Sequence, residues 1–278
     1  MSTRARVLVT GGASGLGAAL VERFAARGDR VLSADLFSGA DLFSGADLLS
    51  GADLFPGDVR GDVVQRRLDV RSAEDWEAAR SWVEEEWGGL DLLVNNAGVA
   101  GGGRVELCSM DDWQRLFDVN LFGVVRGTRA FVPMLKAQGS GRIVNTASLA
   151  GLVHPPGMGS YNAVKAAVVA FSETVAHELA PYGVGCTAVC PSYFRTRLMD
   201  SLHGADPELA STMTRLVEQS PISADDIAAA VLDGLDRGVE LIVPDEPARA
   251  AYSLKLTDRS AYDAQLRAIA ERMRERAG

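Results

Sequence analysis

The chain has 278 residues, of which 47% are hydrophobic and 23% are charged, and these are the proportions of an ordinary globular protein. Its formal net charge of −9 argues against binding to nucleic acid or to an anionic membrane surface and favours small-molecule chemistry. Three cysteines form neither an even disulfide framework nor a C-x-x-C pair, and no signal-peptide pattern or apolar run of about 18 residues is present. We therefore expect a cytoplasmic protein with no membrane span.

The first half of the chain alternates strand-like apolar runs with helical runs. Strands are expected at residues 4–10, 30–34, 62–70 and 90–94, and helices at 16–27 and after Ser72. The run TGGASGLG lies between the first strand and the first helix. Gly11, Gly15 and Gly17 in this run permit a tight turn, close approach of the backbone to a pyrophosphate, and close packing of helix on strand. The run therefore predicts a dinucleotide-binding turn.

A carboxylate follows the second expected strand. Asp35 lies 18 residues beyond Gly17, where a carboxylate accepts hydrogen bonds from the adenosine ribose and repels a 2′-phosphate. Neither the glycine turn nor the residues just after Asp35 offer an arginine or lysine for such a phosphate. The sequence therefore favours NAD over NADP.

Four hexapeptides follow one another from this aspartate: DLFSGA, DLFSGA, DLLSGA and DLFPGD, beginning at Asp35, Asp41, Asp47 and Asp53. Six residues turn a helix by about 600°, so the period builds no amphipathic helix, and the repeated glycine weakens a strand. We interpret residues 36–56 as a loop insertion, which is either a simple tandem duplication, a mobile flap over the adenosine end of the cofactor, or a contact surface for another subunit. Only Asp35 follows a strand-like run, so we assign the ribose contact to it.

The second half continues the alternation. Strands are expected at 142–146, 185–190 and 239–243, and helices at 110–137, 161–180 and 223–236. Residues 150–159, rich in glycine and proline, are expected to form a loop, and residues 198–219 a broken helical lid. We predict a single α/β domain over residues 1–278, a Rossmann-type doubly wound parallel sheet of about seven strands with helices on both faces. A helical extension is expected at 248–278.

Tyr161 and Lys165 lie four residues apart in a helical run and therefore on one face of the helix. A phenol titrates near pH ~10, and an ammonium about 5 Å away favours the phenolate by about 2 pKa units at an effective dielectric constant of about 20. The pair is therefore a candidate proton donor or acceptor. The alternative is that Tyr161 is a packing residue and Lys165 a solvated one.

These residues together resemble the short-chain dehydrogenase/reductase family, from about Arg4 to Pro247. The shared motifs, in the family's order, are TGGASGLG, Asp69-Val70, NNAG at 95–98, Asn120, Ser148, and Tyr161 with Lys165. Ser148 precedes Tyr161 by 13 residues, as in the family's pattern. Ser192 departs from it, because the family commonly has glycine after the proline that follows the sixth strand.

The resemblance implies roles for the matching residues. Tyr161 would be the acid–base, Lys165 would lower its pKa and hold the nicotinamide ribose, and Ser148 would donate to the substrate oxygen. Asn120 would hold a water of a proton relay. The implied cofactor-binding residues are Gly11, Ser14, Gly15, Leu16, Gly17, Asp35, Asp69, Val70, Asn96, Ala97, Gly98, Tyr161, Lys165, Pro191 and Thr196. Members often pair through two long helices, so a homodimer or homotetramer is expected.

The substrate is expected to be a hydrophobic alcohol or ketone, because the candidate pocket residues are mostly apolar. These candidates are Ser148, His154, Met158, Tyr193, Leu198 and Met199. The scattered histidines and cysteines show no metal-ligand spacing. We therefore predict an NAD-dependent oxidoreductase of secondary alcohols and ketones. The alternatives are a catalytically idle NAD-binding regulator, and an isomerase or dehydratase that uses NAD without net turnover.

Overall fold

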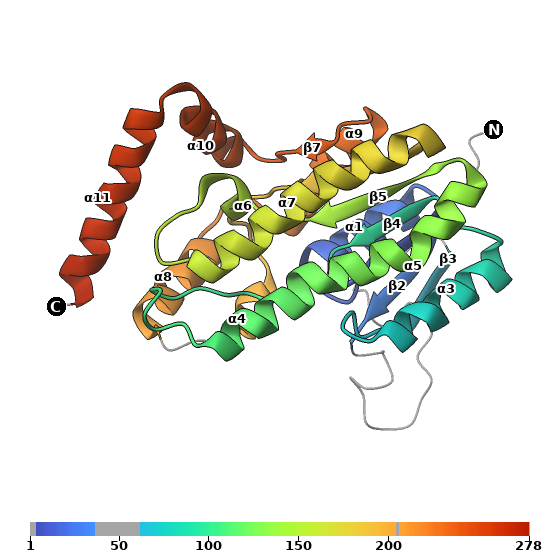
Figure 1. Cartoon of the computed structure of the whole chain (residues 1–278), viewed down its shortest axis with the longest axis horizontal. Coiled ribbons are helices and arrows are strands. Elements are labelled where there is room, and N and C mark those ends of the chain that lie inside the picture. The colour runs from blue at the N-terminus through green and yellow to red at the C-terminus, as the bar shows by residue number, and fades with distance from the viewer. Residues whose placement is uncertain (1–3, 37–61, 204–205, 278) are drawn as a thin grey trace.

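The sheet is parallel throughout, as expected from the alternation of strands and helices. The computed structural model describes residues 4–36, 62–203 and 206–277, and within them seven strands pair in the order β3-β2-β1-β4-β5-β6-β7 (Figure 1). The strands are β1 (Arg6–Thr10), β2 (Arg30–Asp35), β3 (Asp62–Arg67), β4 (Leu92–Asn95), β5 (Gly141–Thr146), β6 (Val184–Val189) and β7 (Leu241–Ile242). The strand order reverses between β1 and β4, which is where ligands bind in such sheets.

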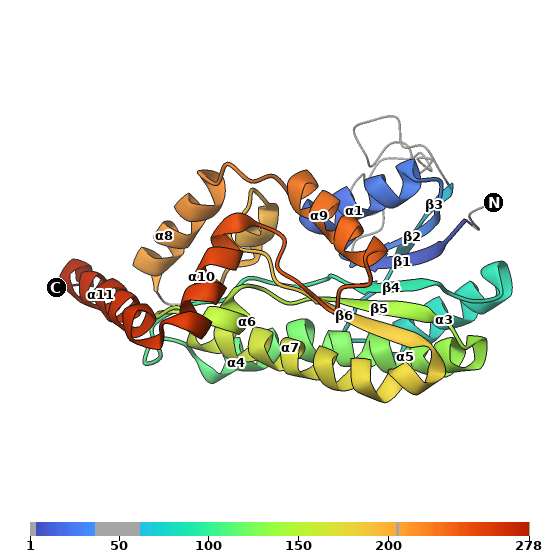
Figure 2. The ribbon, with the colours of Figure 1, turned by 90° about the horizontal axis from the view of Figure 1, so that it is seen from above.

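Helices cover both faces of the sheet, which confirms the predicted doubly wound architecture (Figure 2). One face carries α1 (Gly15–Ala26) and α9 (Ala224–Asp236). The other carries α3 (Ala73–Trp87), α4 (Met110–Phe117), α5 (Gly123–Gln138) and α7 (Gly159–Leu179). Each face has its own apolar core, with Phe24 and Ile227 buried on the first face and Trp76 and Phe131 on the second.

The helix expected at residues 110–137 is interrupted. A π-helical segment, η2 (Asp118–Phe122), separates α4 from α5. It carries Asn120, which is 1% exposed and whose amide exchanges two hydrogen bonds with Val99: it accepts from the backbone N–H at 2.9 Å and donates to the carbonyl at 3.0 Å. A widened turn of this kind re-aims a side chain within a helix, and such turns are frequent at functional sites.

The loop expected at residues 150–159 begins as a short helix, so that prediction was wrong over α6 (Ala150–Val153). The Ser148 hydroxyl accepts a hydrogen bond from the backbone N–H of Ala150 at 3.2 Å, which supports this turn. The last strand, β7, is shorter than the five residues expected. Asp41, Asp47, Asp53 and the rest of residues 37–56 lie outside the described residues.

Four of the remaining helices lie at the end of the sheet where the strands terminate: η4 (Arg197–Ser201), α8 (Pro207–Glu218), α10 (Glu246–Thr257) and α11 (Arg259–Ala277). The short η3 (Ala180–Tyr182) lies at the opposite end, directly before β6. α11 projects beyond the sheet, and its Tyr262 is buried against a cluster that includes Val153 of α6 (Figures 1 and 2). None of the helices among the described residues is long and apolar enough to span a membrane.

Candidate active site

The glycine turn joins β1 to α1 with very little space between them. Gly11 and Gly15 have φ values of +67° and +53°, in the left-handed region that favours glycine. A Cβ on Gly17 would lie 1.9 Å from the carbonyl oxygen of Gly11, and one on Gly15 would lie 2.7 Å from the Thr196 hydroxyl. Gly17 therefore permits close packing of α1 on β1, while Gly15 leaves open the space in front of Thr196.

A cavity of about 750 Å³ runs along the ends of the strands, from the glycine turn to α7 and α8. Of the site residues expected from the sequence, all except Gly17 and His154 line it. They are Gly11, Ser14, Gly15, Leu16, Asp35, Asp69, Val70, Asn96, Ala97, Gly98, Asn120, Ser148, Met158, Tyr161, Lys165, Pro191, Tyr193, Thr196, Leu198 and Met199. Residues spread over more than 180 positions of sequence thus meet at one edge of the sheet.

Two carboxylates lie at the β2–β3 end of the cavity. Asp35 accepts hydrogen bonds from the backbone N–H of Ala13 at 3.0 Å and of Leu36 at 2.7 Å, which hold it beside the glycine turn. Asp69 pairs with Arg71 at 2.6 Å, and hydrogen bonding to that guanidinium holds the pKa of Asp69 below its usual value. Arg71 also lines the cavity, which was not anticipated from the sequence, but Asp69 compensates its charge.

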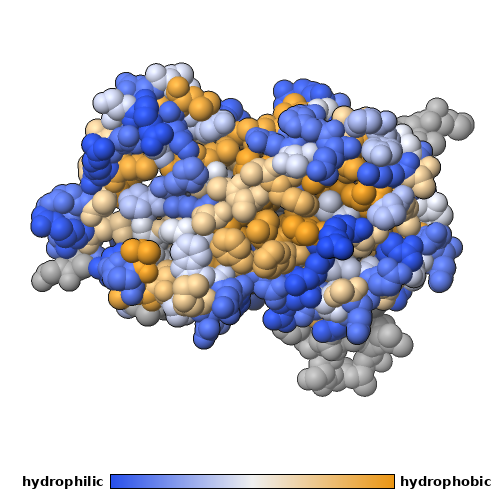
Figure 3. Space-filling model, viewed as in Figure 1, coloured by the Kyte–Doolittle hydropathy of each residue, from blue (hydrophilic) through white to orange (hydrophobic). Residues whose placement is uncertain are grey.

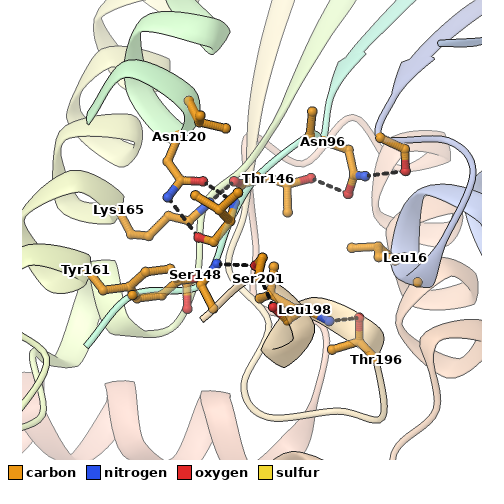
Figure 4. Close-up of a pocket in the computed structure, with 18 of the residues that line it drawn as sticks. Leu16, Asn96, Asn120, Thr146, Ser148, Tyr161, Lys165, Thr196, Leu198 and Ser201 are labelled. Atoms are coloured by element: carbon orange, nitrogen blue, oxygen red, sulfur yellow. Dashed lines mark hydrogen bonds between the residues drawn. The ribbon is translucent and has the colours of Figure 1, made fainter. Parts of the chain in front are cut away.

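The two asparagines that end β4 point in different directions. Asn95 is 3% exposed, and its amide donates to the Asn145 side chain at 2.9 Å inside the sheet. Asn96 donates to the carbonyl of Thr10 at 3.0 Å. It accepts from the Thr146 hydroxyl at 3.2 Å (Figure 4). Asn96 therefore joins the ends of β1, β4 and β5 at the wall of the cavity.

Tyr161 and Lys165 point from α7 into the cavity toward Ser148 (Figure 4). They are 8% and 5% exposed, so the alternative in which Lys165 is solvated is wrong. Lys165 Nζ donates to the carbonyl of Thr146 at 2.9 Å and lies 5.7 Å from the centre of the Tyr161 ring. Side chains from α7, β5 and the segment after β5 thus form one cluster.

Burial controls the titration of this cluster. It raises the pKa of the Tyr161 phenol above its usual value, and a hydrogen bond with Ser148 opposes that shift. Burial also lowers the pKa of Lys165 to about 8. The expectation that Lys165 brings the pKa of Tyr161 down is therefore not met in this structure, because removal from water raises this pKa and the hydrogen bond with Ser148 is the interaction that opposes it.

The far end of the cavity is apolar, with Met158, Leu198 and Met199 as expected and Met213 and Val217 of α8 in addition. The two α8 residues were missed because the sequence places α8 in a lid without showing which of its faces turns inward. His154 does not line this region. Its ring contacts the carbonyl of Gly151 at 3.2 Å and Lys255 Nζ of α10 at 3.2 Å, so it faces the C-terminal helices instead of a substrate.

Two further cavity residues were not found from the sequence. Ser201 in η4 accepts a hydrogen bond from the backbone N–H of Ala100 at 2.9 Å, and Arg115 in α4 donates to the Ser201 carbonyl at 3.2 Å. Both residues connect the lid to the wall formed after β4. No motif or spacing marks either of them in the sequence.

Comparison with known proteins identifies the family to which the chain belongs. The family model described as short chain dehydrogenase matches residues 5–206. The chain belongs to the short-chain dehydrogenase family. One relative, 2-(R)-hydroxypropyl-CoM dehydrogenase of Xanthobacter autotrophicus, is 36% identical over 229 residues, which cover 81% of this chain and 88% of the relative.

Solved structures of short-chain dehydrogenases share the fold. A family member from Burkholderia phymatum, in complex with NAD, has a TM-score of 0.82 and 30% identity, covering 94% of this chain and 96% of that chain. Another from Burkholderia cenocepacia, in complex with NADP, has a TM-score of 0.74 and 28% identity, covering 95% and 97%. Solved short-chain dehydrogenases therefore bind either nucleotide, and a preference in this one has to be argued from its own residues.

Proposed function

We propose that this short-chain dehydrogenase transfers a hydride between NAD and a secondary alcohol or ketone, with Tyr161 as the acid–base. The observation that carries the proposal is the convergence of Tyr161, Lys165 and Ser148 in one cavity with the glycine turn. A cavity of about 750 Å³ is large enough for a nucleotide with a small substrate beside it.

The residues at the β1–β4 end fit a dinucleotide. A Cβ on Gly11 would lie 2.9 Å from the backbone of Ala97, and one on Gly98 would lie 2.7 Å from the Asn120 amide oxygen, so both glycines keep the cavity wall thin. Gly11, Ser14, Gly15 and Leu16 would hold the pyrophosphate at the N-terminus of α1, where backbone N–H groups attract anions. When bound, the nicotinamide ring supplies the hydride acceptor or donor.

Asp35 supports the preference for NAD. Its carboxylate is fixed by two backbone N–H groups beside the glycine turn, and a negative charge there repels a 2′-phosphate. The nearby Arg71 is paired with Asp69, so its guanidinium is already engaged by a carboxylate. We therefore expect a higher kcat/KM with NAD than with NADP.

The proton is handled by residues of α7 and of the segment after β5. Since burial raises the pKa of Tyr161, the phenol holds its proton at neutral pH and donates it to the substrate oxygen as a carbonyl is reduced. Ser148 donates a hydrogen bond to the same oxygen, where negative charge develops. Lys165 is fixed by the carbonyl of Thr146 and keeps a positive charge near the phenol below pH of about 8. In the oxidative direction Tyr161 must first lose its proton to solvent, and its phenolate then accepts the hydroxyl proton.

The substrate is proposed to be hydrophobic, since Met158, Met199 and Met213 form much of the wall beyond Tyr161. Methionine side chains adapt to apolar ligands of different shape. Cys108, Cys186 and Cys190 are all free thiols, which suits the reducing cytoplasm in which we propose that the enzyme works.

We also infer a homodimer or homotetramer. Apolar side chains gather on the face over α5 and α7, and Phe122, just before α5, is 48% exposed (Figure 3). Apolar surface of this kind is typical of protein interfaces. Sedimentation of the purified protein tests this, and a single monomeric species at micromolar concentration would refute it.

The experiment for the activity is reduction of NAD or NADP, followed at 340 nm, with a panel of secondary alcohols. Tyr161→Phe is expected to lower kcat by at least about 100-fold while leaving NAD affinity nearly unchanged, because general acid–base catalysis contributes factors of this size. Tyr182→Phe, at an exposed tyrosine on the far side of the sheet, is the matched control. An active Tyr161→Phe enzyme would contradict the proposed role.

A further inference from the structure

Tyr193 places a second phenol at the cavity, and its hydroxyl donates a hydrogen bond to a weak acceptor. The hydroxyl donates to the thioether sulfur of Met158 at 3.5 Å. A thioether is a weak acceptor, whereas a buried phenol is usually paired with a strong one. Burial raises the pKa of Tyr193, so the group stays protonated and remains a donor at neutral pH.

The backbone around Tyr193 is held from both sides. Ser192, before it, donates to Asp245 through its backbone N–H at 2.9 Å and through its hydroxyl at 2.6 Å. The carbonyl of Tyr193 itself accepts from the Ser220 hydroxyl at 2.8 Å. Phe194, after it, is packed in the apolar core on the α1 face. The phenol is therefore presented to the cavity by a fixed segment, which is what a selective binding group requires.

The Tyr193 hydroxyl lies against a residue of the same helix that carries Tyr161. Met158 is at the N-cap position of α7, three residues and about one turn before Tyr161, and the two side chains belong to one apolar cluster. The two phenols lie close enough to interact, since ionisation of Tyr193 would further raise the pKa of Tyr161. Met199 and Met213, which line the same end of the cavity, are apolar.

We propose that Tyr193 donates a hydrogen bond to a second oxygen of the substrate, and that the enzyme selects alcohols and ketones carrying another hydroxyl or carbonyl within reach of Tyr193 when the reacting oxygen lies at Tyr161. This inference rests on the proposed function, because it takes Tyr161 as the group at the reacting oxygen. Compact rings with two oxygens in a 1,3 or a 1,4 relationship offer two such separations for comparison. The rest of such a molecule would contact the methionines.

The test compares cyclohexanol with cyclohexane-1,3-diol and cyclohexane-1,4-diol as substrates for the wild-type enzyme and for Tyr193→Phe. The wild type is expected to prefer at least one diol, and the variant to lose about tenfold in the ratio of kcat/KM for that diol to kcat/KM for cyclohexanol. A diol offers two reactive hydroxyls to the wild type and to Tyr193→Phe alike. The difference between the two enzymes in the diol-to-cyclohexanol ratio of kcat/KM therefore measures the effect of Tyr193. Tyr182→Phe is the control and is expected to leave the ratio unchanged.

A binding measurement separates failure of this inference from failure of the proposed function. Dissociation constants of the same three compounds are measured by calorimetry in the presence of NADH, for Tyr161→Phe and for Tyr161→Phe combined with Tyr193→Phe. Tighter binding of a diol than of cyclohexanol in Tyr161→Phe, lost in the double variant, supports the role of Tyr193. This result would stand even if no alcohol is turned over and the proposed oxidoreductase activity fails. Equal binding of cyclohexanol and both diols, or a preference that survives in the double variant, would overturn the inference.

Discussion

Replacing Lys165 by methionine should stabilise the protein while removing a group of the active site. Burial lowers the pKa of Lys165 from 10.5 to about 8, and at about 1.4 kcal/mol per tenfold change in proton affinity the buried ammonium costs about 3 kcal/mol at pH 7. Methionine has a similar shape and no charge, but it leaves the carbonyl of Thr146 without its donor, a loss of about 1 kcal/mol. The net expectation is a gain of about 2 kcal/mol in the free energy of unfolding, or roughly 4 °C in Tm.

The pH dependence distinguishes this mechanism from a general packing effect. Between pH of about 8 and 10.5 the unfolded chain holds the Lys165 proton more tightly than the folded protein does, so wild-type stability gains from this residue as the pH rises through that window. The advantage of Lys165→Met should therefore be present at pH 7 and largely gone at pH 10.5.

Thermal and urea denaturation at both pH values, without added nucleotide, measure this difference. Lys136→Met is the matched control for loss of a lysine, because Lys136 lies over the ring of Tyr182 at 4.1 Å, away from the cavity. A Lys165→Met protein that is less stable than wild type at pH 7, or whose advantage is the same at both pH values, would refute the reasoning.

Two further substitutions test the framework of the site. Gly17→Ala should lower the free energy of unfolding by at least about 3 kcal/mol, because its Cβ would lie 1.9 Å from the Gly11 carbonyl oxygen, and should abolish NAD binding in a fluorescence titration. Gly159→Ala is the control: a Cβ there meets no atom within 4 Å, so the free energy of unfolding should change by less than about 1 kcal/mol. Asp245→Ala should lower the free energy of unfolding in urea by about 3 kcal/mol, since this buried carboxylate accepts hydrogen bonds from Ser192 and from the backbone N–H of Ala248. A Gly17→Ala protein that binds NAD normally, or an Asp245→Ala protein of wild-type stability, would contradict these expectations.

The sheet and most of the cavity were predictable because the informative residues follow strand ends. Asp35 ends β2, Asn96 follows β4 and Ser148 follows β5, and the carboxyl ends of parallel strands meet at one edge. Spacing along one helix likewise brought Tyr161 and Lys165 to a single face. Residues near in sequence to a recognisable element could therefore be placed without knowledge of tertiary contacts.

Other features depend on contacts that the sequence does not display. Asn120 lies in a run that is compatible with one continuous helix. The π-helical segment that carries it is accompanied by two hydrogen bonds between its amide and Val99, a partner 21 residues earlier that the sequence does not reveal. His154 turns away from the cavity because Lys255, 101 residues later, contacts its ring. The raised pKa of Tyr161 follows from burial, which a spacing of four residues does not reveal.

Ser192 shows how a departure from the family's pattern acquires a structural reason. Glycine is common at this position, and a glycine lacks the hydroxyl that here donates to Asp245 at 2.6 Å. Asp245 is 6% exposed and also caps α10, so one carboxylate fixes both the segment that presents Tyr193 and the first turn of the C-terminal helices. From α10, Lys255 donates to the carbonyl of Leu152 and contacts His154, just before the segment that carries Met158. Asp245 and Lys255, at the N-cap and near the C-terminus of α10, therefore contact the segments that precede Tyr193 and Met158.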